Sequence, residues 1–374
     1  MKEISEILKA YSEAKNSGKK TALATVVKVE GSSYRQPGAR MLVTEDGSLT
    51  GAISGGCLEG DALRKALLSI NQQQNKLITY NTSNDDDKEI GLQLGCNGIV
   101  HILFEYIDDT VLNNPMHLLQ QLELERKEAV IGTVFSLKRQ AVQLGTMFFY
   151  RDNSAFLYQD EVALRLDSDI KQVIKYKASA VKKMEDDNQN EILIEYVPSS
   201  VSLVIGGAGN DVQPLVKMAS LLGWEVTVID GRATHAVKNR FPDAKNVCMA
   251  KPEDFLEINK NIDDHNFFVL MTHNYKYDLA VLQLLLETSC RYIGILGPKS
   301  KLNRMFDDLS NKGIELNPKM LNRIYGPIGL DIGAETSEEI ALSIVAEIKA
   351  VMNGKNGTSL KYKTDKIHSN IQIV

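Results

Sequence analysis

The stretch that most limits the possible folds of this chain is residues 200–232, "SVSLVIGGAGNDVQPLVKMASLLGWEVTVIDGR". An apolar run leads into a glycine loop, a helical pattern follows, and a second apolar run ends in an acid. This order predicts a β-α-β unit whose glycines let the backbone approach an anion at the helix N-terminus. Strand and helix patterns keep alternating afterwards, so we expect a Rossmann-like, doubly wound parallel sheet in this half of the chain.

The glycine loop carries part of a dinucleotide-binding pattern. Gly207 and Gly209 begin G-x-G-x-x, but Val212 takes the sixth position, where glycine or alanine is usual. Asp230 lies at the spacing expected of an acid that binds a ribose. Asp211 suits the dipole of the following helix but competes with a ligand's phosphate. An occupied site for NAD(P) or another nucleotide, and a fold used only as a scaffold, both remain open.

Two further features of this half are candidates for binding. His273 ends a strand-like run in "VLMTHNYKYDLAVL", and that end of a strand faces the ligand in a doubly wound sheet. It is either a ligand or acid–base group, or a polar residue that closes a strand. Residues 326–336, "GPIGLDIGAET", lead into a helix with the capping-box pattern Thr336 and Glu339. This stretch is either a binding loop or an elaborate helix cap.

The rest of the chain divides into further segments. A length of 374 residues suggests two domains. We expect a mixed α/β N-terminal domain over residues 1–197, in which 109–197 extend the first sheet and form a connector. The Rossmann-like domain is expected over 198–354, and a polar tail over 355–374.

The stretch "AISGGCLEGDAL", residues 52–63, places a cysteine where a strand pattern gives way to a helical one. Cys57 follows Gly55 and Gly56, which leave it accessible, and a thiolate is stabilised by the backbone N–H groups at the start of a helix. Cys96, in "LGCNG", lies in a second loop with glycines. Two thiolates that converge suit a soft metal. The alternative is that both cysteines are small buried residues.

Basic residues and the remaining cysteines complete the candidate list. Arg35 and Arg40 belong to the loop "YRQPGAR", and their guanidinium groups suit a phosphate. Cys248 and Cys290 lie in or beside apolar runs and are expected in the core.

Composition excludes several classes of protein. The net charge of −5 gives no reason to expect a nucleic-acid or anionic membrane partner. None of the four cysteines forms a CxxC pair, and four in so long a chain make no disulfide framework. No apolar run approaches the roughly 20 residues of a membrane span. We therefore expect a cytoplasmic protein with reduced cysteines.

Taken together, the motifs resemble those of the XdhC/CoxI family, the xanthine dehydrogenase accessory proteins. The resemblance rests in the first half on "GSSYRQPGARMLV", "GAISGGCLEGD" and "LGCNGIV". In the second half it rests on "LVIGGAGNDVQPL", "GWEVTVIDGR", "MTHNYKYDLAVL", "YIGILGPKSK" and "GPIGLDIGAETSEEIALSIVAEI". Ordered motifs across two domains are far more specific than a single glycine loop.

The resemblance implies a chaperone for molybdenum cofactor (molybdopterin) rather than an enzyme. Proteins of this kind hold the cofactor while a cysteine desulfurase helps to install its terminal sulfur, and deliver it to a xanthine dehydrogenase-type apoenzyme. On this interpretation Cys57 and Cys96 contact molybdenum or carry the sulfur, and Arg35 and Arg40 hold the pterin phosphate. A homodimer is expected from the frequency of symmetric dimers.

The chain departs from the family pattern at two positions. Asn210 replaces a histidine in the glycine loop, and Tyr325 replaces a histidine before "PIGLDIG". Both departures put histidine-dependent chemistry of the second half in doubt. The main alternative is an NAD(P)-dependent oxidoreductase that uses Gly207, Asp230 and His273. A third interpretation is a nucleotidyltransferase-like or purely structural partner of a molybdenum hydroxylase.

Overall fold

The structure is a computed structural model that describes residues 1–81, 98–111, 114–151, 154–157, 165–184, 190–259 and 262–364. It forms two compact units, one spanning Met1–Ser199 and one that begins at Ser200. Within the described residues, no helix combines the length and apolar character needed to cross a membrane.

The first unit contains two antiparallel sheets, each of five strands. One sheet has the order β3-β2-β1-β5-β4, with β1 (Thr21–Gly31), β2 (Arg40–Thr44), β3 (Leu49–Gly51), β4 (Lys76–Asn81) and β5 (Gly98–Tyr106). The other has the order β8-β7-β6-β10-β9, with β6 (Ala129–Phe135), β7 (Gly145–Arg151), β8 (Ser154–Leu157), β9 (Ala180–Lys183) and β10 (Glu191–Val197). The prediction that residues 109–197 extend the first sheet was wrong, because β6–β10 pair only among themselves.

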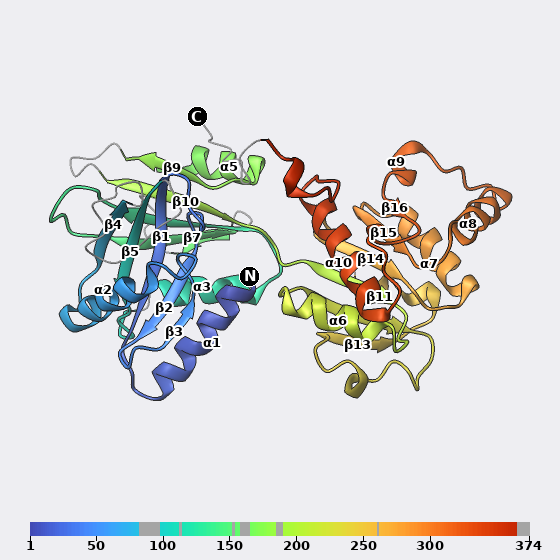
Figure 1. The fold of residues 1–374 in the computed structure, drawn as a ribbon, viewed down its shortest axis with the longest axis horizontal. Helices are drawn as coiled ribbons and strands as arrows, with labels where there is room; N and C mark the ends of the chain where they lie inside the picture. Colours follow the sequence, from blue (N-terminus) through green and yellow to red (C-terminus); the bar gives the residue numbers. More distant parts are fainter. Residues whose placement is uncertain are drawn as a thin grey trace. The chain divides into compact units, whose positions relative to one another are not determined.

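Two helices cover the outer faces of these sheets, and two pack against residues of their inner faces. They are α1 (Lys2–Asn16), α2 (Glu59–Gln72), α3 (Pro115–Leu124) and α5 (Asp167–Tyr176). The helix α2 packs on the first sheet and α5 on the second (Figure 1). Apolar side chains such as Leu103 and Phe135 fill the space between the two sheets. The candidate functional groups of this unit therefore belong to the loops at the edges of the two sheets.

The second unit contains one parallel sheet of six strands. The order is β13-β12-β11-β14-β15-β16, with β11 (Ser202–Gly206), β12 (Glu225–Asp230), β13 (Asn246–Met249), β14 (Asn266–Leu270), β15 (Tyr292–Ile295) and β16 (Ile324–Tyr325). Counted from β11, this is the order 3-2-1-4-5-6 of a doubly wound dinucleotide-type fold. The expected Rossmann-like sheet is confirmed, and the strand order reverses between β11 and β14.

Both faces of this sheet are covered. The helices are α6 (Val212–Leu221), α7 (Tyr275–Leu286), α8 (Lys299–Asn311), α9 (Pro318–Leu321) and α10 (Ser337–Met352). The short 3₁₀ helices are η2 (Lys238–Arg240), η3 (Pro252–Asp254), η4 (Glu257–Asn259) and η5 (Leu360–Tyr362). Apolar residues of α6 and α10 pack on one face, and those of α7 and α8 on the other. Because the strands are buried on both faces, they read as continuous apolar runs in the sequence.

Candidate functional site

Cys57 lies in the segment between β3 and α2. Its side chain is partly exposed and makes no disulfide. The helix begins at Glu59 with Leu58 as its N-cap, so it starts two residues later than the sequence pattern suggested. We call residues 52–58 the cysteine loop. The thiol stands at the entrance to the helix rather than in its first turn.

Two side chains hold the cysteine loop in shape. The Glu59 carboxylate accepts hydrogen bonds from the backbone N–H of Ser54 at 2.9 Å and of Leu58 at 3.1 Å, and from the Ser54 hydroxyl. The Ser54 oxygen in turn accepts from the N–H groups of Gly56 and Leu58, each at 3.1 Å. Gly56 has a φ of +106°, which favours glycine. These bonds fix the backbone on both sides of Cys57.

A second loop, residues 32–39, lies beside the cysteine loop, and we call it the arginine loop. A Cβ built on Gly55 would lie 3.4 Å from Cγ of Tyr34, so the tyrosine ring lies opposite this glycine at about the distance of one methyl group. Arg35 Nη2 donates to both carboxylate oxygens of Glu3 in α1, at 2.6 and 2.5 Å. Glu3 also accepts from the N–H of Ala52 at 3.1 Å. The two loops are therefore joined at two points.

The two candidate arginines have different environments. The Arg35 side chain is 28% exposed, next to the cysteine loop. Arg40 is 2% exposed and forms a two-pronged ion pair with Glu195 of β10, at 3.0 and 2.5 Å. Its Nη1 also donates to the carbonyl of Gly38 at 2.9 Å. Arg40 thus links the two sheets, and its predicted contact with a phosphate stays a prediction without support from this geometry.

Cys96 lies outside the described residues. Gly98 is the first residue of β5, and it pairs with Gly31 at the end of β1. A Cβ on Gly98 would collide with the backbone of Glu30 and Ser32, so the two strands are in close contact there. Among the residues that the structure describes, no three His, Cys, Asp or Glu side chains are grouped to hold a metal. The predicted pairing of Cys57 with Cys96 stays a prediction.

The remaining cysteines lie in the second unit. Cys290 is buried, as expected. Cys248 in β13 is partly exposed, because it lies on an edge strand of the sheet, so the prediction that it belongs to the core was wrong.

The glycine loop of the second unit crosses the point where the strand order reverses. Gly207 has a φ of +130°, and a Cβ there would collide with the carbonyl of Met271 at the end of β14. Only glycine combines this backbone conformation with so close an approach. The helix α6 then begins at Val212, with Asp211 as its N-cap residue. The loop is thus built as the sequence predicted.

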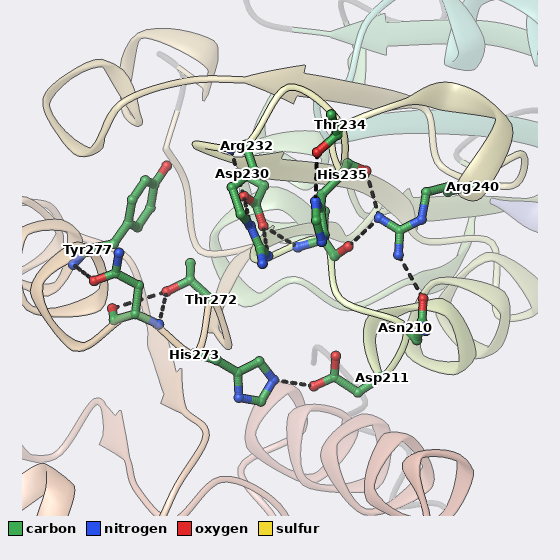
Figure 2. A network of polar contacts seen from close by, with 12 residues as sticks. Asn210, Asp211, Asp230, Arg232, Thr234, His235, Arg240, Thr272, His273 and Tyr277 are labelled. Carbon is green, nitrogen blue, oxygen red and sulfur yellow. Dashed lines mark hydrogen bonds and ion pairs between the residues drawn. The ribbon is translucent and has the colours of Figure 1, made fainter.

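Asp230 ends β12 and is 2% exposed. Its carboxylate accepts from the N–H of Ala208 at 2.8 Å, and from the backbone N–H, Nε and Nη2 of Arg232 at 2.9, 2.9 and 2.7 Å. Burial raises the pKa of Asp230, but the hydrogen bonds from Arg232 and Ala208 outweigh it and lower the pKa below its ordinary value. Asp230 therefore fastens the glycine loop to β12, as Figure 2 shows.

His273 and Asp211 form a contact at the same edge of the sheet. The ring Nε2 of His273 lies 2.8 Å from Oδ2 of Asp211 (Figure 2). The other oxygen of Asp211 occupies the space that a Cβ on Gly209 would need. His273 has a φ of +57°, a conformation that L residues seldom adopt. The predicted residues Gly207, Gly209, Asp230 and His273 thus lie around one edge.

Sequence reasoning missed Arg240 at this edge. Its Nη1 donates to the carbonyl of Ala208 at 2.6 Å, and its Nη2 to Oδ1 of Asn210 at 2.8 Å. Asn210 is thus an acceptor for a guanidinium at a position where the family pattern has histidine. No local spacing could have found this contact, because the partners lie 30 residues apart.

The stretch 326–336 is tied to α10. Gly329 donates its N–H to Glu347 at 3.0 Å, and Thr336 forms the expected capping box with Glu339. Tyr325 stacks on Tyr292, with ring centroids 4.5 Å apart. These contacts are those of a helix cap, and the alternative of a binding loop stays untested.

Comparisons with known proteins extend over both units. Residues 203–348 match the XdhC Rossmann domain, and residues 14–81 match the XdhC and CoxI family. A protein of Bacillus subtilis (strain 168), named as a probable subunit of xanthine dehydrogenase, is 31% identical over 326 residues, which cover 87% of this chain and 91% of that protein. The molybdenum cofactor insertion chaperone PaoD of Escherichia coli (strain K12) is 22% identical over 345 residues, covering 92% of this chain and 87% of PaoD.

A solved structure is similar as well. The crystal structure of a Bacillus halodurans protein, described as a xanthine dehydrogenase, has a TM-score of 0.73 and 29% sequence identity, and the match covers 96% of this chain and 99% of that one. The chain belongs to the XdhC and CoxI family.

Proposed function

We propose that this protein is an accessory protein that binds molybdenum cofactor as its cargo and delivers it to a xanthine dehydrogenase-type molybdenum hydroxylase. Membership of the XdhC and CoxI family supports this, as do the names of the relatives from Bacillus subtilis and Escherichia coli. The proposal makes the cofactor a substrate that is held and passed on. The proposal does not make the protein an enzyme that acts on another substrate.

The observation that carries the proposal is the partly exposed thiol of Cys57 on a loop held by Ser54 and Glu59. A thiolate is a soft ligand, which suits a transition metal. Arg35 lies beside this loop with its guanidinium partly exposed, and such a fork suits a phosphate. We assign molybdenum to Cys57 and the cofactor's phosphate to Arg35.

The finer parts of the proposal concern sulfur and partners. While the cofactor is held, a cysteine desulfurase helps to install its terminal sulfur, and Cys96 assists Cys57. The apoenzyme then receives the sulfurated cofactor. A cytoplasmic homodimer is the form in which we expect the protein to act.

The alternative of an NAD(P)-dependent oxidoreductase fits the glycine loop poorly. A ribose that binds Asp230 must displace the guanidinium of Arg232 from both carboxylate oxygens. A pyrophosphate at the start of α6 must displace the Asp211 carboxylate from above Gly209. The arrangement therefore accepts a dinucleotide only after two rearrangements. One separates Asp230 from Arg232, and the other moves Asp211 away from Gly209 and His273.

The test measures how much molybdenum the protein retains after incubation with the cofactor. The purified full chain is incubated with molybdenum cofactor released from a molybdoenzyme, desalted, and measured for molybdenum by mass spectrometry. We expect near-stoichiometric metal in the wild type and at least a tenfold loss in Cys57→Ala. Cys96→Ala tests the second cysteine in the same way.

Cys248→Ala is the matched control, because this cysteine is also partly exposed but lies in β13 of the second unit. It should retain as much molybdenum as the wild type. If the wild type retains no metal, or if Cys57→Ala retains all of it, the proposed role of the cysteine loop is wrong. A tight complex of the wild type with NADH in the same preparation would favour the oxidoreductase instead.

A further inference from the structure

Tyr34 is an exposed aromatic residue placed directly on the cysteine loop. The residue is 68% exposed, a large value for a tyrosine. Single exposed apolar side chains are common on protein surfaces, so exposure alone carries no functional meaning. The contacts of the ring and of its neighbours indicate a function for Tyr34.

One face of the ring is turned toward the backbone of the cysteine loop. A Cβ built on Gly55 would lie 3.4, 3.5 and 3.6 Å from Cγ, Cδ1 and Cδ2 of Tyr34. Nearly equal distances to three adjacent ring atoms mean that the glycine meets the face of the ring and not its edge. One face of Tyr34 is therefore turned toward Gly55, with room for about one methyl group between the two.

The backbone on both sides of Tyr34 is also tied in place before any ligand arrives. Its neighbour Arg35 is bonded to Glu3, and Glu3 is bonded to Ala52 of the cysteine loop. Farther along, Gly38 donates its N–H to the carbonyl of Val26 at 2.9 Å. A loop whose backbone is already tied down loses less conformational entropy when it binds, which strengthens binding.

The position of the ring relative to the thiol suits a flat ligand that carries a metal. Gly55 and Cys57 are two residues apart, so their Cα atoms lie at most about 7 Å apart. A fused heteroaromatic ring stacked on Tyr34 thus has the Cys57 thiol within reach of groups attached to its side. Stacking of a flat heterocycle on an aromatic side chain contributes about 1–3 kcal/mol for nucleic-acid bases.

We infer that Tyr34 is a stacking platform for the pterin ring system of the cargo, next to the thiol that contacts its metal. This inference rests on the proposed function and adds a binding residue to it. The cysteine loop then recognises its ligand through two different chemistries. Cys57 binds the metal, and Tyr34 binds the organic ring whether or not the metal is present.

This division can be measured with two probes. One is molybdenum cofactor, followed by retained molybdenum, and the other is metal-free pterin-6-carboxylate, followed by the anisotropy of its own fluorescence. Tyr34→Ala should weaken the binding of both probes about tenfold. Cys57→Ala should lose the molybdenum but bind the metal-free pterin within about twofold of the wild type.

The choice of variants separates stacking from other effects. Within the described residues the Tyr34 hydroxyl has no hydrogen-bond partner, so Tyr34→Phe should bind both probes as the wild type does. Tyr34→Leu keeps an apolar side chain over Gly55 but lacks a ring, and should behave as Tyr34→Ala. Tyr176→Ala is the matched control, since Tyr176 is 53% exposed at the end of α5 in the same unit.

The outcomes also separate this inference from the proposed function. If the wild type binds both probes and Tyr34→Ala binds them equally well, the stacking role is overturned while the chaperone proposal stands. If Tyr34→Leu matches the wild type, the contact is apolar cover and the inference again fails. A wild type that binds neither probe overturns both proposals.

Discussion

The two glycine-rich loops of this protein use their polar groups in opposite ways. In the second unit, Asp230 accepts from the amide of Ala208, and Asp211 covers Gly209. Both carboxylates come from the loop's own neighbourhood, and Asp211 stands where a Rossmann-type loop would meet an anion. In the first unit, Ser54 and Glu59 also fasten a loop, but they leave the Cys57 side chain partly exposed.

The difference teaches that a glycine pattern predicts a loop's shape better than its occupancy. Glycines are needed wherever the backbone turns sharply or approaches another strand, whether a ligand or a side chain fills the space beside them. The glycine loop has the fuller motif and its own internal partners. The cysteine loop has the shorter motif and a thiol that faces outward. Three changes test this contrast, beginning with the largest expected effect.

Replacement of Asp230 by alanine should open the closed loop. The change leaves the buried Ala208 amide without its acceptor, so the free energy of unfolding of the second unit should fall by about 2–3 kcal/mol. The loss of the Arg232 pair adds little, because that side chain is 48% exposed to solvent. Urea unfolding followed by tryptophan fluorescence measures this, since Trp224 is the only tryptophan and is buried in the second unit.

Asp307→Ala serves as the comparison, because Asp307 is an exposed aspartate of α8 in the same unit. Its effect should stay within about 0.5 kcal/mol. If Asp230→Ala has wild-type stability, the carboxylate does not hold the glycine loop to β12 and is available to a ligand.

A change of pH should affect the stability of the two units differently. Glu105 of β5 is buried in the first unit, accepts from the N–H of Thr146 at 2.6 Å, and burial raises its pKa to about 7 from an ordinary value of 4.5. The folded state therefore holds this proton more tightly than the unfolded state does. Stability of the first unit should fall as pH rises from about 4.5 to 7, by up to about 3 kcal/mol.

The measurement is urea unfolding followed by far-UV circular dichroism at pH 5 and pH 8, with Trp224 reporting the second unit in the same samples. Glu105→Gln keeps an acceptor for Thr146 and should remove this decrease. Glu123→Gln, at an exposed position of α3, should keep it. An equal pH dependence in wild type and Glu105→Gln would show that Glu105 does not titrate in this range.

The smallest effect concerns Arg35. Glu3→Gln should weaken its hold on the guanidinium while the Gln carbonyl still accepts from Ala52. Removing one competing carboxylate from an exposed pair is worth about 0.5 kcal/mol, so binding of molybdenum cofactor should tighten about twofold. A titration with phosphate-free pterin should show no such gain. Weaker binding of the cofactor by Glu3→Gln would mean that Arg35 needs Glu3 to hold the phosphate.

Much of the second unit could be predicted from sequence because its signals are local. Apolar runs, the glycines and Asp230 lie within one β-α-β stretch, and strands buried on both faces leave no ambiguity of pattern. The first unit was harder. Strands β6 and β10 look the same whether they extend one sheet or build another, since a strand's pattern does not name its partner.

The candidate sites divide in the same way. The sequence placed Cys57 at the start of a helix, which in the structure begins two residues later, and it also named the residues around the glycine loop. The sequence could not show that Arg40 forms an ion pair with Glu195, because the two residues lie 155 positions apart. Nor did it identify the Ser54–Glu59 contact, whose spacing differs from the three-residue spacing of a capping box.

The Asp230 carboxylate has one more consequence, which concerns concentration. It is tethered to the loop that it binds, so its effective concentration at the Ala208 amide does not change when the protein is diluted or the cell's metabolites vary. Any free anion competes against this permanent internal partner. The second unit should therefore keep the same loop conformation over a wide range of nucleotide levels, and its stability should not depend on their supply.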